Sequence, residues 1–215
     1  MKALIINFNR VFLPQVMAEW LAARGCEPIF IDNASDYPPL LAYYESCQFQ
    51  VVRMPANYGH TVVWDCDLLA QLGIFERYIV TDPDLDLAGV PDDFLNVLHY
   101  GLDRYRTYAK CGLSLEVNDL PDTPEGHLVR TQYEVRYWQK PLGDRYFIAD
   151  TDTTLAMYRE GIKHYTHSAI RTNRPYTAKH LPWYYTDVAS LPEDEQYYFK
   201  TANGSSSGKK RLINN

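Results

Sequence analysis

Three carboxylates follow an apolar, strand-like segment in the stretch RYIVTDPDLDL, residues 77–87. Asp82, Asp84 and Asp86 are spaced two apart, so in an extended chain their side chains point to one face and repel one another. A divalent cation such as Mg²⁺ or Mn²⁺ relieves this repulsion, because it is typically held by one or two carboxylates and by substrate phosphates. The spacing therefore favours a metal-dependent phosphate site. The structural alternative is a solvated acidic turn bent by Pro83.

Two other kinds of acidic site were compared with the sequence. An EF-hand loop needs glycine where this chain has Leu87, and a helix rather than a strand should precede it. The segment IADTDTT places Asp150 and Asp152 after another apolar run, and its letters match the D-x-D-x-T pattern of haloacid dehalogenase-like phosphatases. In those enzymes the first aspartate attacks phosphate and the second handles protons. Little chain follows to supply that family's later lysine and acidic pair, so the phosphatase stays an alternative.

The composition narrows the class of protein. The chain has 215 residues, of which 46% are hydrophobic and 22% charged, and its net charge is −6. The negative charge argues against a nucleic-acid partner, since binding to a phosphate backbone needs an excess of Lys and Arg. No secretory signal and no apolar span of about 18 residues occurs, so we expect a cytoplasmic protein with no transmembrane segment. Reduced thiols are expected for the four cysteines, which show no paired or zinc-like spacing: Cys26, Cys47, Cys66 and Cys111.

Strands and helices alternate in the first part of the chain, which predicts an α/β fold with a parallel sheet. In such sheets the ligand lies at the carboxyl ends of the strands. The predicted strands are 2–9, 27–35, 49–55, 77–82, 109–117 and 144–150, and the predicted helices are 13–25, 67–73, 91–105 and 124–139. After residue 150 the sequence reads as irregular. We expect one domain over 1–202, and 203–215, which is polar and rich in Gly and Ser, as a flexible tail or a linker to a further domain.

Four segments occur in an order that resembles small GT-A glycosyltransferases of bacteria and large algal (chlorella-type) viruses: TDPDLD, CGLSLEVNDLPD, DTTLAMYR and AIRTNRPYTAKHLPWYY. The resemblance covers most of residues 1–200. It implies a GT-A type, Rossmann-like mixed sheet flanked by helices, with an irregular C-terminal acceptor region. It also implies transfer of a hexose or deoxyhexose from a nucleotide sugar, UDP-linked, to a glycan acceptor. For a viral protein the compartment would be the host cytoplasm.

The resemblance assigns a metal, Mn²⁺ or Mg²⁺, that bridges the D-x-D segment and the diphosphate of the UDP-sugar. Asp84 would be the direct ligand, Asp82 would lie nearer the ribose or a metal-bound water, and His180 would complete the shell. The third acid, Asp86, leaves open which two carboxylates reach the metal. A buried histidine bonded to backbone is the structural alternative for His180.

Nucleotide contacts are expected at strand ends, at a glycine that permits close backbone approach, and at late cations that grip the diphosphate. The structural alternative for these residues is that they are ordinary turn residues or part of an exposed basic loop. The predicted nucleotide-binding residues are Asn7, Asn9, Arg10, Asp32, Asn57, Gly59, Asp82, Arg171 and Lys179.

An inverting transfer needs a carboxylate that accepts the proton of the acceptor hydroxyl. Asp152 is the first candidate for this catalytic base, and Asp150 is the second. Trp183, Tyr184 and Tyr185 are candidates for stacking on the acceptor sugar, with ordinary hydrophobic packing as the alternative. A non-catalytic, metal-dependent glycan-binding module within a longer protein is the third hypothesis for function, suggested by the linker-like tail.

Overall fold

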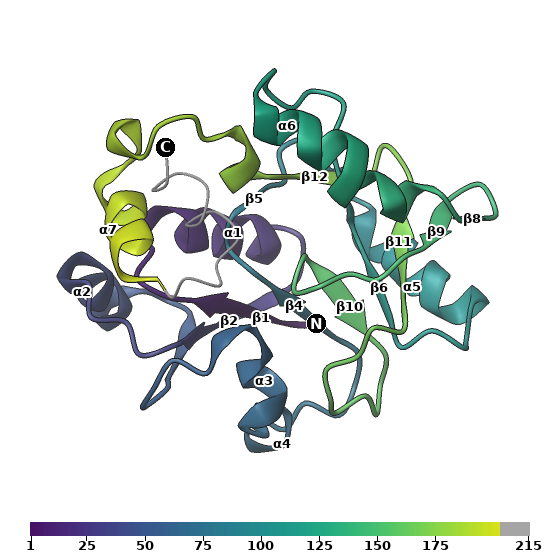
Figure 1. The fold of residues 1–215 in the computed structure, drawn as a ribbon. Helices are drawn as coiled ribbons and strands as arrows, with labels where there is room; N and C mark the ends of the chain where they lie inside the picture. The colour runs from purple at the N-terminus through teal and green to yellow at the C-terminus, as the bar shows by residue number, and fades with distance from the viewer. Residues whose placement is uncertain (203–215) are drawn as a thin grey trace.

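The computed structural model of the chain describes residues 1–202 and contains a nine-stranded mixed sheet with helices on both faces (Figure 1). The predicted α/β class with a mixed sheet flanked by helices is confirmed. The order of the strands in this sheet is β3-β2-β1-β4-β10-β6-β11-β9-β8, and a smaller sheet has the order β5-β12-β7. No helix within residues 1–202 has the length and apolar character needed to cross a membrane.

The strands and helices have the following bounds. The strands are β1 (Lys2–Asn7), β2 (Glu27–Asp32), β3 (Gln50–Arg53), β4 (Tyr78–Thr81), β5 (Leu85–Asp86), β6 (Lys110–Gly112), β7 (Ser114–Leu115), β8 (Pro141–Leu142), β9 (Tyr146–Ile148), β10 (Ala156–Tyr158), β11 (Ala169–Thr172) and β12 (Thr177–His180). The α-helices are α1 (Phe12–Ala22), α2 (Pro38–Ser46), α3 (Val62–Asp65), α4 (Leu68–Gln71), α5 (Phe94–Arg104), α6 (Pro124–Leu128) and α7 (Glu193–Thr201). A π-helical turn, η2 (Val129–Tyr133), follows α6, and the 3-10 turns are η1 (Gly59–Thr61), η3 (Val135–Trp138), η4 (Leu181–Tyr184) and η5 (Val188–Ser190).

The parallel half of the large sheet reverses its strand order beside β1. Strands β1, β2 and β3 are added outward in sequence, and the chain then returns to place β4 on the other side of β1. In open α/β sheets such a reversal separates the loops that leave the two neighbouring strands and creates a crevice at their carboxyl ends. The loop after Asn7 and the acidic segment after Thr81 are therefore the two walls of this crevice.

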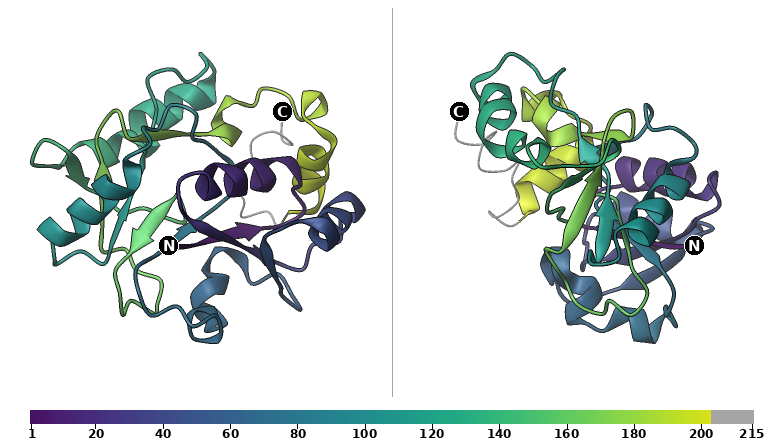
Figure 2. Two further views of the ribbon diagram at one scale, coloured as in Figure 1. Left: turned by 180° about the vertical axis from the view of Figure 1, so that it is seen from behind. Right: turned by 90° about the vertical axis from the view of Figure 1, so that its right-hand side faces the viewer.

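Alternate side chains of β1 enter two different hydrophobic clusters. Ala3 and Ile5 pack with Met17 and Leu21 of α1, whereas Leu4 and Ile6 pack on the side of α3 and α4. This is the expected result of the two-residue period of a strand that is covered on both faces. Figure 1 shows α1 above the strands and α3 and α4 below them, and the view from behind in Figure 2 shows the same separation.

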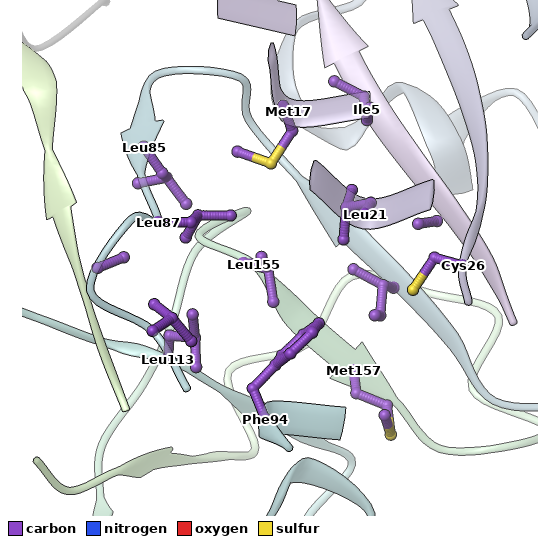
Figure 3. Packing of buried hydrophobic residues seen from close by; sticks show 14 of the residues in the cluster. Ile5, Met17, Leu21, Cys26, Leu85, Leu87, Phe94, Leu113, Leu155 and Met157 are labelled. Atoms are coloured by element: carbon purple, nitrogen blue, oxygen red, sulfur yellow. The ribbon is translucent and has the colours of Figure 1, made fainter. Parts of the chain in front are cut away.

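Two leucines fix the acidic segment in place. Leu85 and Leu87 are 7% and 4% exposed and belong to the same hydrophobic cluster as Met17, Leu113 and Leu155. Figure 3 shows the two leucines among these apolar side chains. Because they alternate with acids, the burial of the leucines forces the neighbouring carboxylates out of the core.

The prediction that the chain becomes irregular after residue 150 is wrong. Strand β10 lies between β4 and β6 in the middle of the large sheet, antiparallel to both, and its three residues are buried. Strands β11 and β12 and helix α7 follow. A three-residue strand that is buried on both faces has too few residues to show a periodic pattern, so the sequence carries no clear signal for it.

Two predicted elements are divided in the structure. The predicted strand 109–117 becomes β6 and β7, which belong to different sheets. The predicted helix 124–139 becomes α6, η2 and η3, so its hydrogen-bonding pattern changes twice along the segment. Helix α2, which begins with two prolines, was not predicted. The tail prediction for 203–215 lies outside the described residues.

Gly101 in the middle of α5 offers a test of the core. Replacing a helical glycine by alanine normally stabilises the helix by about 1 kcal/mol. Here an added Cβ would lie 2.8 Å from Cε1 of Tyr146 and 3.0 Å from Sγ of Cys111, and the Tyr146 hydroxyl is anchored on the Val97 carbonyl. We therefore predict that Gly101→Ala lowers the free energy of unfolding by about 1–3 kcal/mol, measured by urea denaturation.

The control for this prediction lies on the same helix. Asn96 is exposed, so Asn96→Ala should leave the free energy of unfolding unchanged or raise it slightly. A Gly101→Ala variant that is as stable as Asn96→Ala would contradict the close packing of α5 on Tyr146.

Candidate functional site

A cavity of about 540 Å³ lies at the carboxyl ends of the parallel strands. Its walls come from the loops after β1, β2, β3 and β4, from η2 and η3, from β12 and η4, and from α7. Its volume is in the range of small-molecule sites. Nine of the predicted site residues line it: Asn7, Arg10, Asn57, Gly59, Asp82, Asp84, Asp152, Arg171 and His180.

Asp82 directly follows β4, and hydrogen bonds of both its backbone and its side chain to Thr153 fix its position. Its amide donates to the Thr153 carbonyl, and its Oδ2 accepts a hydrogen bond of 2.5 Å from the Thr153 hydroxyl. Burial raises the pKa of the Asp82 carboxyl well above its ordinary value, and the negative charges of Asp84 and Asp152 raise it further. The ionised form of Asp82 is therefore disfavoured unless positive charge enters the cavity.

Asp84 has the opposite electrostatic character. Burial alone would raise its pKa, but the positive charge of Arg10 and then that of His180 outweigh burial and hold the pKa below its ordinary value. Arg10 Nη1 lies 3.1 Å from Asp84 Oδ2, and His180 Nε2 lies 3.8 Å from the same oxygen. Two neighbouring aspartates of one motif are thus driven in opposite directions by their surroundings.

Asp86, the third acid of the motif, does not line the cavity. Its side chain accepts a hydrogen bond from the Ala88 amide within its own turn. The structure therefore separates Asp82 and Asp84, which face the cavity, from Asp86. Spacing alone left this choice open.

Arg10 is the most strongly paired cation of the site. Its side chain is 4% exposed, its Nε lies 2.7 Å from Glu195 of α7, and its guanidinium lies 3.5 Å from the ring centroid of Tyr198. Asp194 of the same helix accepts the amides of Val11 and Phe12. Helix α7 therefore fixes the loop that carries Arg10.

Asn7 and the loop after β3 form another part of the cavity wall. Asn7 Nδ2 donates to the Arg10 carbonyl and to the Tyr44 hydroxyl. Its Oδ1 is buried and accepts no hydrogen bond from any residue in 1–202, so it is available to a ligand. Gly59 has a φ of +75°, which favours glycine, and its carbonyl accepts from Asn33. Asn57 accepts the Gly59 amide, and both line the cavity as predicted.

Three predicted nucleotide contacts do not line the cavity, and two of them, Asn9 and Asp32, contact other parts of the chain instead. The carbonyl oxygen of the Asn9 side chain accepts the amides of Asp36 and Tyr37, and its amide group donates to Asp36 and Thr201. Asp32 is fully buried, and its carboxylate lies 3.4 Å from Arg53 Nε. Strand-end position identified both residues but not the direction of their side chains.

Lys179 and Asp150 also lie off the cavity wall. The Lys179 ammonium forms an ion pair with Asp119, which raises the pKa of the lysine. Asp150 Oδ2 lies 2.6 Å from Nδ1 of His167. Lys179 directly precedes His180, and Asp150 lies two positions before Asp152. Since His180 and Asp152 line the cavity, an error of one or two positions accounts for the difference.

Asp152 reaches the cavity beside two residues that sequence analysis missed. The Tyr165 hydroxyl donates to Asp152 Oδ1 at 3.0 Å, and His60 Nε2 lies 3.9 Å from the same oxygen. The Asp152 side chain is 61% exposed, so solvent or a ligand reaches it. His60 directly follows the predicted Gly59, but a single histidine in a loop carries no pattern that would have identified it.

An aromatic and charged wall faces the strand ends. It consists of Tyr133, Glu134, Arg136 and Tyr137, which come from η2, η3 and the residue between them. Glu134 and Arg171 form a buried ion pair, and Tyr137 covers the Arg171 guanidinium at 4.2 Å. Burial raises the pKa of Glu134, and Arg171 opposes that shift. Arg171 was predicted from the sequence, but the four residues of this wall were not, because one regular helix was expected over 124–139.

Of the three residues predicted to stack on an acceptor sugar, Trp183 lines the cavity. The Tyr184 hydroxyl donates to Asp119, and the Tyr185 hydroxyl lies 3.5 Å from Glu195. Trp183 also packs edge-on against His180, with ring centroids 4.7 Å apart.

The donor atoms of the site suit a hard divalent cation in type. Within residues 1–202, no group of three or more His, Cys, Asp or Glu side chains is arranged to hold a metal ion. Asp82 and Asp84 nevertheless bring two carboxylates to one cavity, where their mutual repulsion is relieved by positive charge. This fits Mg²⁺ or Mn²⁺ held by one or two carboxylates and completed by substrate phosphates, rather than a cage made only of protein ligands.

The chain was also compared with known proteins. No family model matches it, and no curated protein matches it. The geometry of the cavity is therefore the basis for any functional conclusion.

The raised pKa of Asp82 gives a testable pH dependence. Well below its unfolded pKa of about 4, the carboxyl is protonated in both the folded and the unfolded state, so its burial costs nothing. As the pH rises towards the higher folded pKa, the unfolded state loses its proton first and the folded state loses stability. We predict that Asp82→Asn is more stable than the natural chain at pH 7, and that the difference shrinks as the pH falls to about 4.

Urea unfolding in the presence of a chelator measures this difference. Asp122→Asn, at an exposed position, removes the same charge from the surface and should show little change at either pH. An Asp82→Asn variant that is no more stable at pH 7, or whose advantage does not depend on pH, would contradict the electrostatic description of Asp82.

Proposed function

We propose that the protein is a metal-dependent glycosyltransferase of the GT-A type. In this proposal it transfers a hexose or deoxyhexose from a nucleotide sugar, UDP-linked, to a glycan acceptor. The single observation that supports it best is the position of the Asp82–Asp84 pair. The pair lies in a cavity at the point where the strand order reverses beside β1, which is where α/β sheets bind nucleotides.

The distribution of charge in the cavity supports binding of a diphosphate despite the negative charge of the whole chain. Arg10, Arg136 and Arg171 all line the cavity, so three guanidinium groups lie there beside the acids Asp82, Asp84, Glu134 and Asp152. Arginine is suited to phosphate because its planar guanidinium donates two parallel hydrogen bonds. The bound metal would supply further positive charge for the leaving diphosphate, with Asp82 and Asp84 as its protein ligands.

The two sides of the cavity suit the two substrates. The strand-end side offers the Asn57–Gly59 loop and Asn7, whose buried side-chain oxygen accepts no hydrogen bond from the described residues, and both fit a nucleoside. The other side offers Tyr133 and Trp183, whose rings can cover the apolar face of a sugar. We therefore place the nucleotide against β1–β3 and the acceptor against η2, η3 and η4.

For an inverting transfer, Asp152 is positioned to accept a proton. The acceptor oxygen would form a bond to the anomeric carbon as the bond from that carbon to the phosphate oxygen breaks. The acceptor proton would pass to Asp152, and the bonding electrons would leave with the nucleoside diphosphate. Tyr165 donates to Oδ1 of Asp152 and so orients the carboxylate, whose charge contributes to the raised pKa of Asp82 close by.

Calorimetric titration of UDP tests the nucleotide site directly. We predict binding that requires Mn²⁺ or Mg²⁺ and is lost with chelator. Asp84→Asn should weaken it by roughly tenfold to a hundredfold or more. Asp86→Asn is the matched control, because it removes the same group from the same motif at a position that does not line the cavity.

Either of two results would oppose the proposal. One is the absence of UDP binding under every metal condition. The other is an equal loss of binding in Asp84→Asn and Asp86→Asn, which would indicate a general effect of charge.

The catalytic role of Asp152 requires a separate experiment. We predict that Asp152→Asn keeps metal-dependent UDP binding but lowers the rate of sugar transfer by about 10²–10⁴-fold, the usual contribution of a general base. Transfer is measured as UDP release from a panel of UDP-sugars with glycan acceptors present.

Asp150→Asn is the control for Asp152→Asn, since Asp150 contacts His167 and does not line the cavity. Equal loss of binding and transfer in Asp152→Asn would refute the base assignment. Loss of transfer in Asp150→Asn alone would move the role to that residue.

A further inference from the structure

One carboxylate oxygen of the acidic pair already has a cation against it. Arg10 Nη1 contacts Asp84 Oδ2 at 3.1 Å, and both side chains are almost completely buried. A divalent ion that binds Asp84 would meet this guanidinium at the same oxygen. Ion and guanidinium therefore compete for one ligand atom.

Arg10 has a second carboxylate partner that does not belong to the D-x-D segment. Glu195, 2% exposed, lies 2.7 Å from Arg10 Nε, and Tyr198 covers the guanidinium face. Both residues belong to α7. If Arg10 left Asp84, its charge would still be paired with Glu195, so the move would not leave a buried guanidinium without a counter-charge.

We propose that Arg10 is an internal counter-ion of Asp84 that a divalent cation displaces, and that Glu195 of α7 retains the displaced guanidinium. The proposal rests on the proposed function, since the cation is the one expected beside the nucleotide diphosphate. It gives Arg10 a positioning role that the sequence resemblance does not assign.

The proposal makes α7 part of the metal site although none of its residues is a ligand. Asp194 anchors the Arg10 loop through two backbone amides, and Asn9 connects that loop to Thr201. Cation affinity at Asp84 should therefore depend on the pairing between Arg10 and Glu195. By linkage, any ligand that favours the Arg10–Glu195 pair also favours cation binding.

Binding of Mn²⁺ alone is the direct test, measured from the electron paramagnetic resonance signal of the free ion. The double variant Arg10→Met/Glu195→Gln removes one positive and one negative charge and leaves Asp84 without its competitor. We expect it to bind Mn²⁺ about tenfold or more tightly than the natural chain. Glu195→Gln alone leaves Arg10 with Asp84 as its carboxylate partner, so it should bind Mn²⁺ more weakly.

A matched control separates displacement from a general change of charge. Arg171→Met/Glu134→Gln removes another buried ion pair of the same cavity, and the contacts of that pair do not include Asp84. It should leave Mn²⁺ affinity close to that of the natural chain. Asp84→Asn added to Arg10→Met/Glu195→Gln should remove the gain, and urea unfolding with chelator checks that each variant is folded.

The results distinguish this inference from the proposed function. Equal Mn²⁺ affinity in Arg10→Met/Glu195→Gln and the natural chain, or an equal gain in the Arg171/Glu134 control, overturns the displacement. Tighter Mn²⁺ binding by Glu195→Gln overturns the role of α7. If the Mn²⁺ results are as expected and UDP does not bind, the displacement stands and the glycosyltransferase proposal fails. If metal-dependent UDP binding is found without any gain in Arg10→Met/Glu195→Gln, the inference alone fails.

Discussion

Repulsion between the carboxylates of Asp82, which is partly buried, and Asp84, which is buried, is the interaction on which the rest of the cavity depends. Asp82 and Asp84 are held in one cavity because Leu85 and Leu87 are fixed in the core. The energy of core burial therefore opposes the electrostatic cost of bringing the acids together. A fold that tolerates such a cost at one point normally does so because a ligand or a counter-charge relieves it.

The structure distributes this cost unequally. Asp84 receives the charges of Arg10 and His180, whereas Asp82 receives a hydrogen bond from Thr153 and the repulsion of two neighbouring acids. The pair consequently has one carboxylate that stays ionised and one that ionises reluctantly. A cation entering between them would gain most from Asp82, whose charge is least compensated, and would meet competition at Asp84.

The parallel half of the fold and the wall that it contributes to the cavity could be predicted from the sequence. Apolar runs followed by polar residues identify β1, β2 and β4 and place their ends at one edge, so the contribution of Asn7, Asp82 and Asp84 follows from topology. The direction of a side chain one residue further along does not follow. Asn9 and Asp32 lie near the same edge, but local backbone amides and Arg53 determine where they point.

Central strands of the antiparallel half were missed for a different reason. Strand β6 lies within the predicted strand 109–117, but β10 and β11, which have three and four residues, all of them buried, were not predicted. Such strands are specified by tertiary packing rather than by a local pattern. Helix α7 did carry a signal, because Pro192 precedes three acids in the first turn and Lys200 lies in the last turn.

The division of the chain explains why the site needs both ends of the sequence. The nucleotide side comes from early strands. Glu195, which pairs with the Arg10 guanidinium beside Asp84, comes from α7, the last helix described. The contact between Arg10 and Glu195 closes a long stretch of chain, so this pair forms only when α7 is docked. The buried Arg10–Glu195 pair is weak evidence for a gain in stability, since an apolar pair of similar size often replaces such an ion pair without loss. Its position against a crowded D-x-D segment instead favours a role in setting the charge that an incoming ligand meets. On this argument, helix α7 determines the charge of the site as much as the acidic motif does.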